Sequence, residues 1–119
     1  MTAPNIVNVA TITGKLVGYA VTDSLGDVGV SNSSSSGKVF KVNAMYAANV
    51  DGTNDAHVSV SVQKGGSTDF YIVKTVNVPA DSTLDVLSKA IYLEENDKLR
   101  AVAQAASDIQ LLVSYEEIS

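Results

Sequence analysis

The sequence predicts an all-β fold: a single-domain antiparallel β-sandwich of about eight strands, with jelly-roll or immunoglobulin-like topology and little or no helix. Short runs of alternating apolar and polar residues recur roughly every 8 to 12 residues, as expected of a sandwich. Val and Ala dominate the apolar residues, and Val favours strands because it is branched at Cβ. The 119 residues match the usual size of one domain, so we expect one sandwich over residues 1–119.

An N-terminal strand or arm is expected over about residues 1–22. Residues 6–13 and 15–22 are both rich in β-branched side chains, and only Gly14 separates them. This spacing is compatible with a tight turn or with one long strand that bends at a bulge. We favour the bent strand.

A flexible Gly/Ser-rich loop is expected over about residues 23–37. Its composition is Gly, Ser, Asp and Asn, which cannot bury enough apolar surface to order the segment. Leu25, Val28 and Val30 are exceptions. They would anchor the first half of the loop or hold it against a neighbour.

The clearest alternation follows this loop. Residues 38–50 are expected to place one set of side chains on a buried face, namely Phe40, Val42, Ala44 and Tyr46. Residues 57–63 are expected to point Val58, Val60 and Val62 inward, and Ser59 and Ser61 outward. Both segments therefore predict half-buried strands.

The second half of the chain continues in the same way. Gly65 and Gly66 predict a hairpin turn, because paired glycines accept the positive φ angles that such turns need. Residues 70–78 are apolar on both faces and end at Pro79, so this strand is either central or faces a partner. Short strands follow at 84–87, 90–93, 99–103 and 109–118. Helical turns at 82–88 or 101–107 are alternatives, but both are shorter than the roughly 12 residues that propensity alone needs.

Composition excludes several classes of function. The net charge is -5 and the eight basic residues are scattered, so we expect neither nucleic-acid nor membrane binding. No secretory signal and no apolar run of about 20 residues is present, which predicts a soluble protein made in the cytoplasm. The absence of Cys excludes disulfides and thiolate chemistry.

Residue patterns that could support catalysis or metal binding are few. His57 lies near Asp55 and Ser59, but neighbouring side chains of one strand project in parallel and do not converge as a catalytic triad requires. We expect a solvent-facing His and no enzyme. Asp51 and Asp55 are the calcium candidates, although turns recruit Asp for its hydrogen bonds to the backbone. No cofactor or metal is expected.

Four segments resemble a family of small virion structural proteins of tailed bacteriophages, of the kind found in phages of cyanobacteria and marine bacteria. The segments are 49–53 (NVDGT), 78–84 (VPADSTL), 92–100 (YLEENDKLR) and 114–118 (SYEEI). The resemblance covers about residues 37–118. It implies a β-sandwich subunit of the virion, made in the host bacterial cytoplasm and without catalytic residues.

The resemblance does not distinguish capsid, neck and tail positions, and our first hypothesis is a capsid decoration or cement protein, a homotrimer that contacts other virion proteins such as the major capsid protein. A neck, collar, tail or fibre component is the alternative within the virion, and a carbohydrate-binding or host-attachment module is the alternative from another class. The apolar residues expected at interfaces are Ile6, Val7, Val9, Leu25, Val28, Phe70 and Tyr71.

Overall fold

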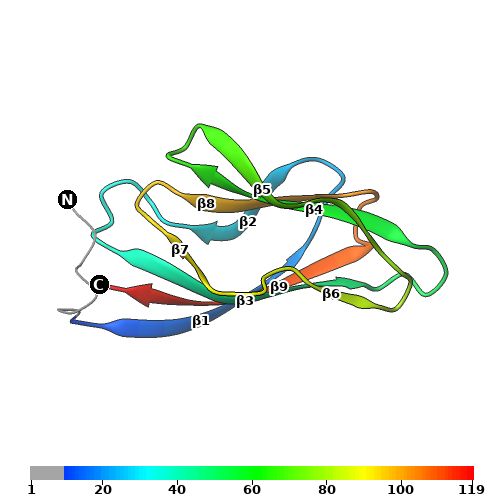
Figure 1. Ribbon diagram of the computed structural model, residues 1–119, viewed down its shortest axis with the longest axis horizontal. Coiled ribbons are helices and arrows are strands. Elements are labelled where there is room, and N and C mark those ends of the chain that lie inside the picture. Colours follow the sequence, from blue (N-terminus) through cyan, green and yellow to red (C-terminus); the bar gives the residue numbers. More distant parts are fainter. Residues whose placement is uncertain (1–9) are drawn as a thin grey trace.

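The fold is a sandwich of two antiparallel sheets, seen in a computed structural model that describes residues 10–119 (Figure 1). The predicted all-β class is confirmed. The strands are β1 (Ile12–Ala20), β2 (Gly26–Ser31), β3 (Val39–Asn49), β4 (Ala56–Lys64), β5 (Thr68–Val78), β6 (Thr83–Asp85), β7 (Ile91–Leu93), β8 (Lys98–Ala103) and β9 (Ile109–Ile118). Within residues 10–119 there is no helix of the length and hydropathy needed to cross a membrane.

The two sheets have the strand order of a jelly roll. Sheet A runs β1-β9-β3-β6, with the short β7 pairing with the other half of β3, and sheet B runs β2-β8-β4-β5. Most connections pass from one sheet to the other, and the β4–β5 hairpin is an exception. The first described residues lie beside the C-terminus, since the N–H groups of Ala10 and Thr11 donate to the Ser119 carbonyl.

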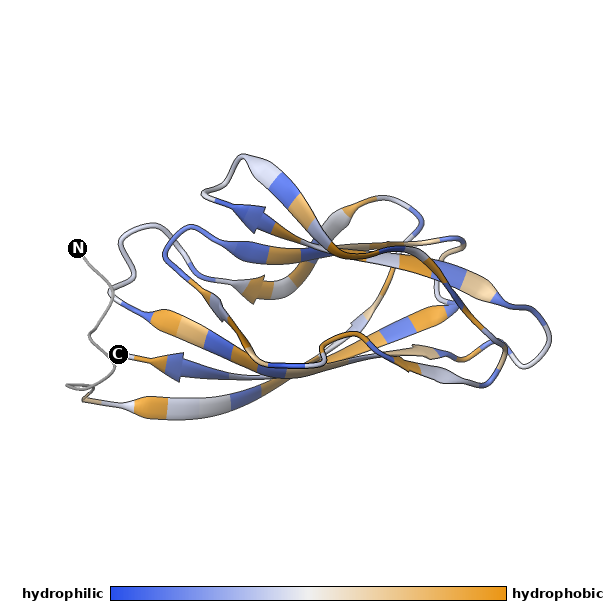
Figure 2. Cartoon of the chain, in the orientation of Figure 1, coloured by the Kyte–Doolittle hydropathy of each residue, from blue (hydrophilic) through white to orange (hydrophobic). Residues whose placement is uncertain are grey.

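The core lies between the facing surfaces of the two sheets, where apolar and polar residues alternate along the strands (Figure 2). The predicted alternation of β8 and β9 is confirmed, because their inward residues are buried and their neighbours are not. Burial of each large apolar side chain contributes about 1.5–3 kcal/mol to the free energy of unfolding. The largest of these are Met45, Leu93, Leu99, Ile109 and Leu111.

A β-bulge changes the face on which the second half of β3 places its side chains. The register with β9 shifts between Val42 and Ala44, so the alternation restarts there. Phe40 and Val42 are buried as predicted, but Tyr46 is exposed. Met45 and Ala47 take the core positions instead. The expectation that Ala44 and Tyr46 share the buried face was therefore wrong.

The predicted loop over residues 23–37 contains a strand. Strand β2 pairs with β8, and its Val28 and Val30 are fully buried in the core. Two valines spaced by one residue suffice to attach this short strand to the sandwich, and Gly29 with φ of 91° forms its bulge. The prediction of one continuous loop was wrong, because the connection between β2 and β3 comprises only residues 32–38.

The face of β4 opposite the core is covered rather than open to solvent. Ser59 and Ser61 are buried, contrary to expectation. The Thr75 N–H of a bulge in β5 donates to Ser59 Oγ at 2.8 Å, and Ser61 Oγ donates to the Asp69 carboxylate at 3.1 Å. A backbone N–H and a carboxylate of the neighbouring strand β5 thus satisfy these hydroxyls.

The backbone conformation decides four other local predictions, which concern a bend, a turn, a strand end and two helical turns. Residues 12–20 form one strand that pairs with β9 without a turn or bulge at Gly14. The bent strand that we favoured, and the tight turn that was its alternative, were therefore both wrong at this position. Gly65 and Gly66 form the predicted hairpin turn with φ of 62° and 73°. Strand β5 ends immediately before Pro79. The segments 82–88 and 101–107 contain no helix.

Hydrogen bonds of buried polar side chains attach the loops to the sandwich. The Asp97 carboxylate accepts hydrogen bonds from the N–H groups of Gly65 and Glu94 and from Lys64 Nζ, each at 2.9 Å. Glu94 and Asp97 in turn raise the pKa of Lys64. Asn49 Nδ2 donates to the carbonyls of Asn54 and Val78. These contacts compensate for the burial of polar groups.

We predict that Val60→Asp destabilises the protein by about 3–5 kcal/mol or prevents folding, because it places an unpaired carboxylate in the core. Val60 is fully buried. The control is Val50→Asp, at a residue that is 48% exposed, which should leave the melting temperature nearly unchanged. Circular dichroism with thermal melting measures both. Equal stability of the two variants would mean that the register of β4 is wrong.

Candidate assembly surface

The outer face of sheet A, which points away from the core, carries exposed apolar side chains on three adjacent strands. Leu16 on β1 is 65% exposed, and Leu112 on β9 and Tyr46 on β3 are each 43% exposed. The pairing registers set Tyr46 directly beside Leu112, and Leu112 beside Gly18. A contiguous exposed apolar surface of this kind is typical of a binding face.

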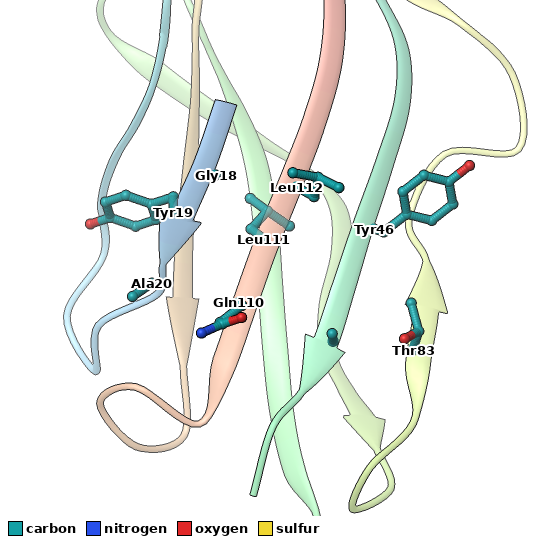
Figure 3. Close-up of a pocket in the computed structure, with 9 residues that line it drawn as sticks. Gly18, Tyr19, Ala20, Tyr46, Thr83, Gln110, Leu111 and Leu112 are labelled. Atoms are coloured by element: carbon teal, nitrogen blue, oxygen red, sulfur yellow. The ribbon is translucent and has the colours of Figure 1, made fainter. Parts of the chain in front are cut away.

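A hollow of about 590 Å³ lies beside Tyr46 and Leu112 (Figure 3). It extends across β1, β9, β3 and β6, and none of the residues that line it is charged. Small residues form much of its surface, so the strand backbones lie close to solvent there. The lining residues are Gly18, Tyr19, Ala20, Tyr46, Ala48, Thr83, Gln110, Leu111 and Leu112.

Strand β1 forms one edge of sheet A. In an antiparallel pair, hydrogen-bonded and non-hydrogen-bonded residue pairs alternate. The N–H groups of Thr11 and Val21 donate to the carbonyls of Ser119 and Ile109 on the β9 side, so the odd-numbered residues of β1 bond to β9. The even-numbered residues therefore direct their N–H and C=O groups away from the sheet. These residues are Ile12, Gly14, Leu16, Gly18 and Ala20.

The other edges of the two sheets are short or irregular. Strands β6 and β7 have three residues each. Strand β2 has a register shift and a glycine with positive φ. Strand β5 has two register shifts, one of them at Thr75, whose φ is 51°. Short strands and bulges are devices that block unwanted strand pairing.

An ion-pair cluster holds β1 at one end. Glu117 on β9 accepts a hydrogen bond from Lys38 Nζ at 3.0 Å and pairs with Lys15 Nζ at 3.1 Å. Burial raises the pKa of Glu117, but the two lysines more than offset this, so its pKa lies below the ordinary value. The hydrogen bond from Lys15 raises the pKa of that lysine.

The calcium candidates are engaged in loop hydrogen bonds. Asp51 accepts hydrogen bonds from the N–H groups of Thr53 and Asn54, which hold its pKa below the ordinary value. Asp55 accepts hydrogen bonds from Asn77 Nδ2 and Ala80 N–H. Among residues 10–119 no three carboxylate or imidazole side chains converge as a metal site requires.

The residues of the catalytic pattern do not converge either. His57 is half-buried, and its backbone N–H donates to Gln104 Oε1. Ser59 Oγ is occupied by the Thr75 N–H, and Asp55 bonds to the segment that follows β5. In the described part of the chain, no hydrogen bond joins the His57 ring to either side chain.

The predicted interface residues divide into three groups. Ile6, Val7 and Val9 lie outside the described residues. Val28 belongs to the core, so its assignment to an interface was wrong, and Leu25 is half-buried. Phe70 and Tyr71 are 61% and 41% exposed on the edge strand β5, so the alternative of a central strand was also wrong.

Sequence reasoning missed Leu16, Tyr46 and Leu112. The alternation of β9 already placed Leu112 opposite the buried Leu111 and Val113, and this signal could have identified it. Tyr46 was concealed by the β3 bulge, which strand alternation does not reveal. Leu16 faces the outer side of sheet A because its neighbour Val17 packs against the core, and no further strand flanks it because β1 is an edge, which the sequence does not reveal.

We predict that Glu117→Gln lowers the melting temperature at pH 7 by about 2–6 °C. Because the pKa of Glu117 is lowered by folding, its stabilisation is present above its ordinary value of 4.5 and is lost as the pH falls through the lower folded value. The variant should therefore lose less stability than the natural protein between pH 6 and pH 3.

Thermal melting across this range checks the prediction. Glu116→Gln is the matched control, since among the described residues the neighbouring Glu116 has no ion pair. Identical acid profiles for the natural protein and Glu117→Gln would contradict the role of this cluster.

Comparison with known proteins gives a likeness in fold. No protein-family model matches the chain, and no curated protein matches its sequence. A similar solved structure comes from work described as "Bacillus endospore appendages form a novel family of disulfide-linked pili". That chain is 15% identical with a TM-score of 0.52, over 89% of this chain and 85% of its own length. At this identity the similarity concerns the fold alone.

Proposed function

We propose that the protein is a non-enzymatic structural subunit that binds neighbouring proteins through the outer face of sheet A. The observation that carries this proposal is the group of exposed apolar side chains on three adjacent strands of one face, namely Leu16, Leu112 and Tyr46. An apolar face beside an uncharged hollow gains free energy when another protein covers it. Repetition of one such contact by symmetry makes many weak contacts strong.

Within this class we propose a place in the virion of a tailed bacteriophage, as a capsid decoration or cement protein. The support is the resemblance of residues 37–118 to small phage structural proteins, together with the jelly-roll fold. The partners would be other copies, in the homotrimer expected of a decoration protein, and the major capsid protein. A neck, collar, tail or fibre position is the alternative within the virion.

A filament subunit is a second candidate function. The fold similarity to a chain from disulfide-linked pili favours it. These 119 residues include no Cys, so a filament that they form would need contacts other than disulfides between them. The apolar outer face of sheet A is the surface available for them.

A carbohydrate-binding or host-attachment module is the candidate from another class. It draws support from Tyr46, an aromatic side chain at the hollow, and from the nearby Gln110 and Thr83. Glycan-array binding that is lost in Tyr46→Ala would favour it. An array without any bound glycan would count against it.

Copy number and location test the proposed assembly. We predict hundreds of copies of the protein, by quantitative mass spectrometry, in purified virions of the phage that encodes it, with density on the capsid surface. About a dozen copies would point to a neck or tail position, and long filaments without virions would point to a pilus. Its absence from every particle fraction would overturn the proposal.

The surface itself is tested with a double variant, Tyr46→Ser with Leu112→Ser. We predict that this variant folds normally and that its incorporation into particles falls at least tenfold, because it removes apolar area from the outer face of sheet A. The matched control is Phe70→Ser with Tyr71→Ser, which removes exposed aromatics from sheet B. Equal incorporation of the two variants would contradict the assignment of this face.

A further inference from the structure

We infer that the partner of the β1 edge is β1 of a second copy, related by a two-fold axis, so that the sheets A of two protomers form one continuous sheet. The inference rests on the proposed role as an assembly subunit and names the partner of the β1 edge, which adjoins the outer face of sheet A. It follows from the hydrogen-bonding groups of β1, from the state of the other edges and from the side chains along the strand.

The first step is the set of free backbone groups. Each even-numbered residue from Ile12 to Ala20 directs one N–H donor and one C=O acceptor away from β9. No hydrogen bond from another described residue reaches these groups. They are arranged along a nine-residue strand, about 30 Å long at roughly 3.3 Å per residue. Such an edge is a template for one further strand.

The second step is the absence of features that block pairing. All nine residues of β1 pair with β9 without a register shift, and the strand contains no Pro. Its charged residue is Lys15, whose backbone bonds to β9 and whose ammonium group pairs with Glu117. Edges that must stay unpaired normally carry a bulge, Pro or exposed charge. Strand β1 has none of these at its outward-facing positions.

The third step identifies the partner strand. A pairing along the whole of β1 needs a second edge that is equally long and regular. Among residues 10–119, the edges β2, β5, β6 and β7 are short or have register shifts, which leaves β1 of another copy. Two identical edges pair antiparallel across a two-fold axis. A cyclic trimer would need two different edges, so this contact favours a dimer over the expected trimer.

The fourth step sets the register. When the two-fold axis passes between the two Leu16 residues, every outward-facing backbone group of β1 finds a partner. The opposed residues are then Leu16 with Leu16, Gly14 with Gly18, and Ile12 with Ala20. All of these are even-numbered residues with outward-facing groups, so each becomes a hydrogen-bonded pair. The two Leu16 side chains, exposed in the monomer, meet on the outer face. The glycines beside them leave room.

The area of this contact predicts its strength. A strip about 30 Å long and about 10 Å thick gives roughly 300 Å² per partner. This is below the roughly 800 Å² per partner of a standard stable interface. The isolated protein should therefore be a concentration-dependent mixture of monomer and dimer. In an assembly, the other contacts of the subunit would hold the pair together.

Single cysteines test the register, since the natural chain has none. Under mild oxidation Leu16→Cys should form a disulfide-linked dimer at least tenfold faster than Val50→Cys, an exposed residue that reports random collisions. The Cα atoms of a hydrogen-bonded pair lie about 5.5 Å apart, within disulfide range. Faster linkage of Gly14→Cys or Gly18→Cys than of Leu16→Cys would overturn the register. No variant exceeding Val50→Cys would overturn the pairing.

Proline variants separate pairing from folding. Leu16→Pro removes an outward-facing N–H, which an edge strand tolerates, and should abolish the dimer in analytical ultracentrifugation while the fold persists. Val17→Pro removes an N–H that bonds to β9 and should destabilise the fold itself. A dimer that persists in folded Leu16→Pro would overturn the inference. If Leu16→Pro instead fails to fold, the cysteine series alone decides.

Particle incorporation distinguishes this inference from the proposed function. A protein found in particles whose Leu16→Cys variant does not cross-link would refute the β1 pairing and leave the structural role standing. A cross-linked dimer that enters no particle would refute the structural role and leave the pairing standing.

Discussion

Within residues 10–119 the two sheets present four edges, and the pairing of the backbone N–H and C=O groups at each edge connects the stability of this sandwich to its assembly. Three edges are short or bulged, and the bulge at Thr75 even supplies the N–H that satisfies the buried Ser59. The fourth edge, β1, is long and regular. In the part of the chain that the structure describes, backbone hydrogen bonding therefore leaves the β1 edge as the place where a further strand fits.

Strand β9 links this edge to the apolar outer face. Its inward residues, among them Leu111 and Val113, fill the core, and its outward Leu112 lies between Gly18 of β1 and Tyr46 of β3. The β3 bulge is what turns Tyr46 outward. At the far end of the strand, Glu117 attaches β1 through Lys15. The core packing of β9, the β3 bulge and the Lys15–Glu117 ion pair thus fix the position of the β1 edge relative to the outer face of sheet A.

Much of the fold could be predicted, because alternation reports directly which side of a strand is buried. It identified the strands β4, β8 and β9, although both faces of β4 are buried. The paired glycines identified the turn between β4 and β5. It failed at β2, where two valines stabilise a strand within a polar segment, and beyond the β3 bulge, where the parity changes. The candidate surface was mostly missed, because exposure of Leu16 and Tyr46 depends on strand order and on that bulge, and both are set by long-range pairing.

Amide hydrogen exchange along β1, followed by NMR at increasing protein concentration, tests the central claim that this edge is open and pairs with a second copy. In dilute protein the amides of Leu16 and Gly18 should exchange rapidly, while those of Val17 and Tyr19, which bond to β9, should be protected. Concentrated or assembled protein should show all four protected. Protection of Leu16 and Gly18 at every dilution, or rapid exchange even in the assembled state, would contradict the account.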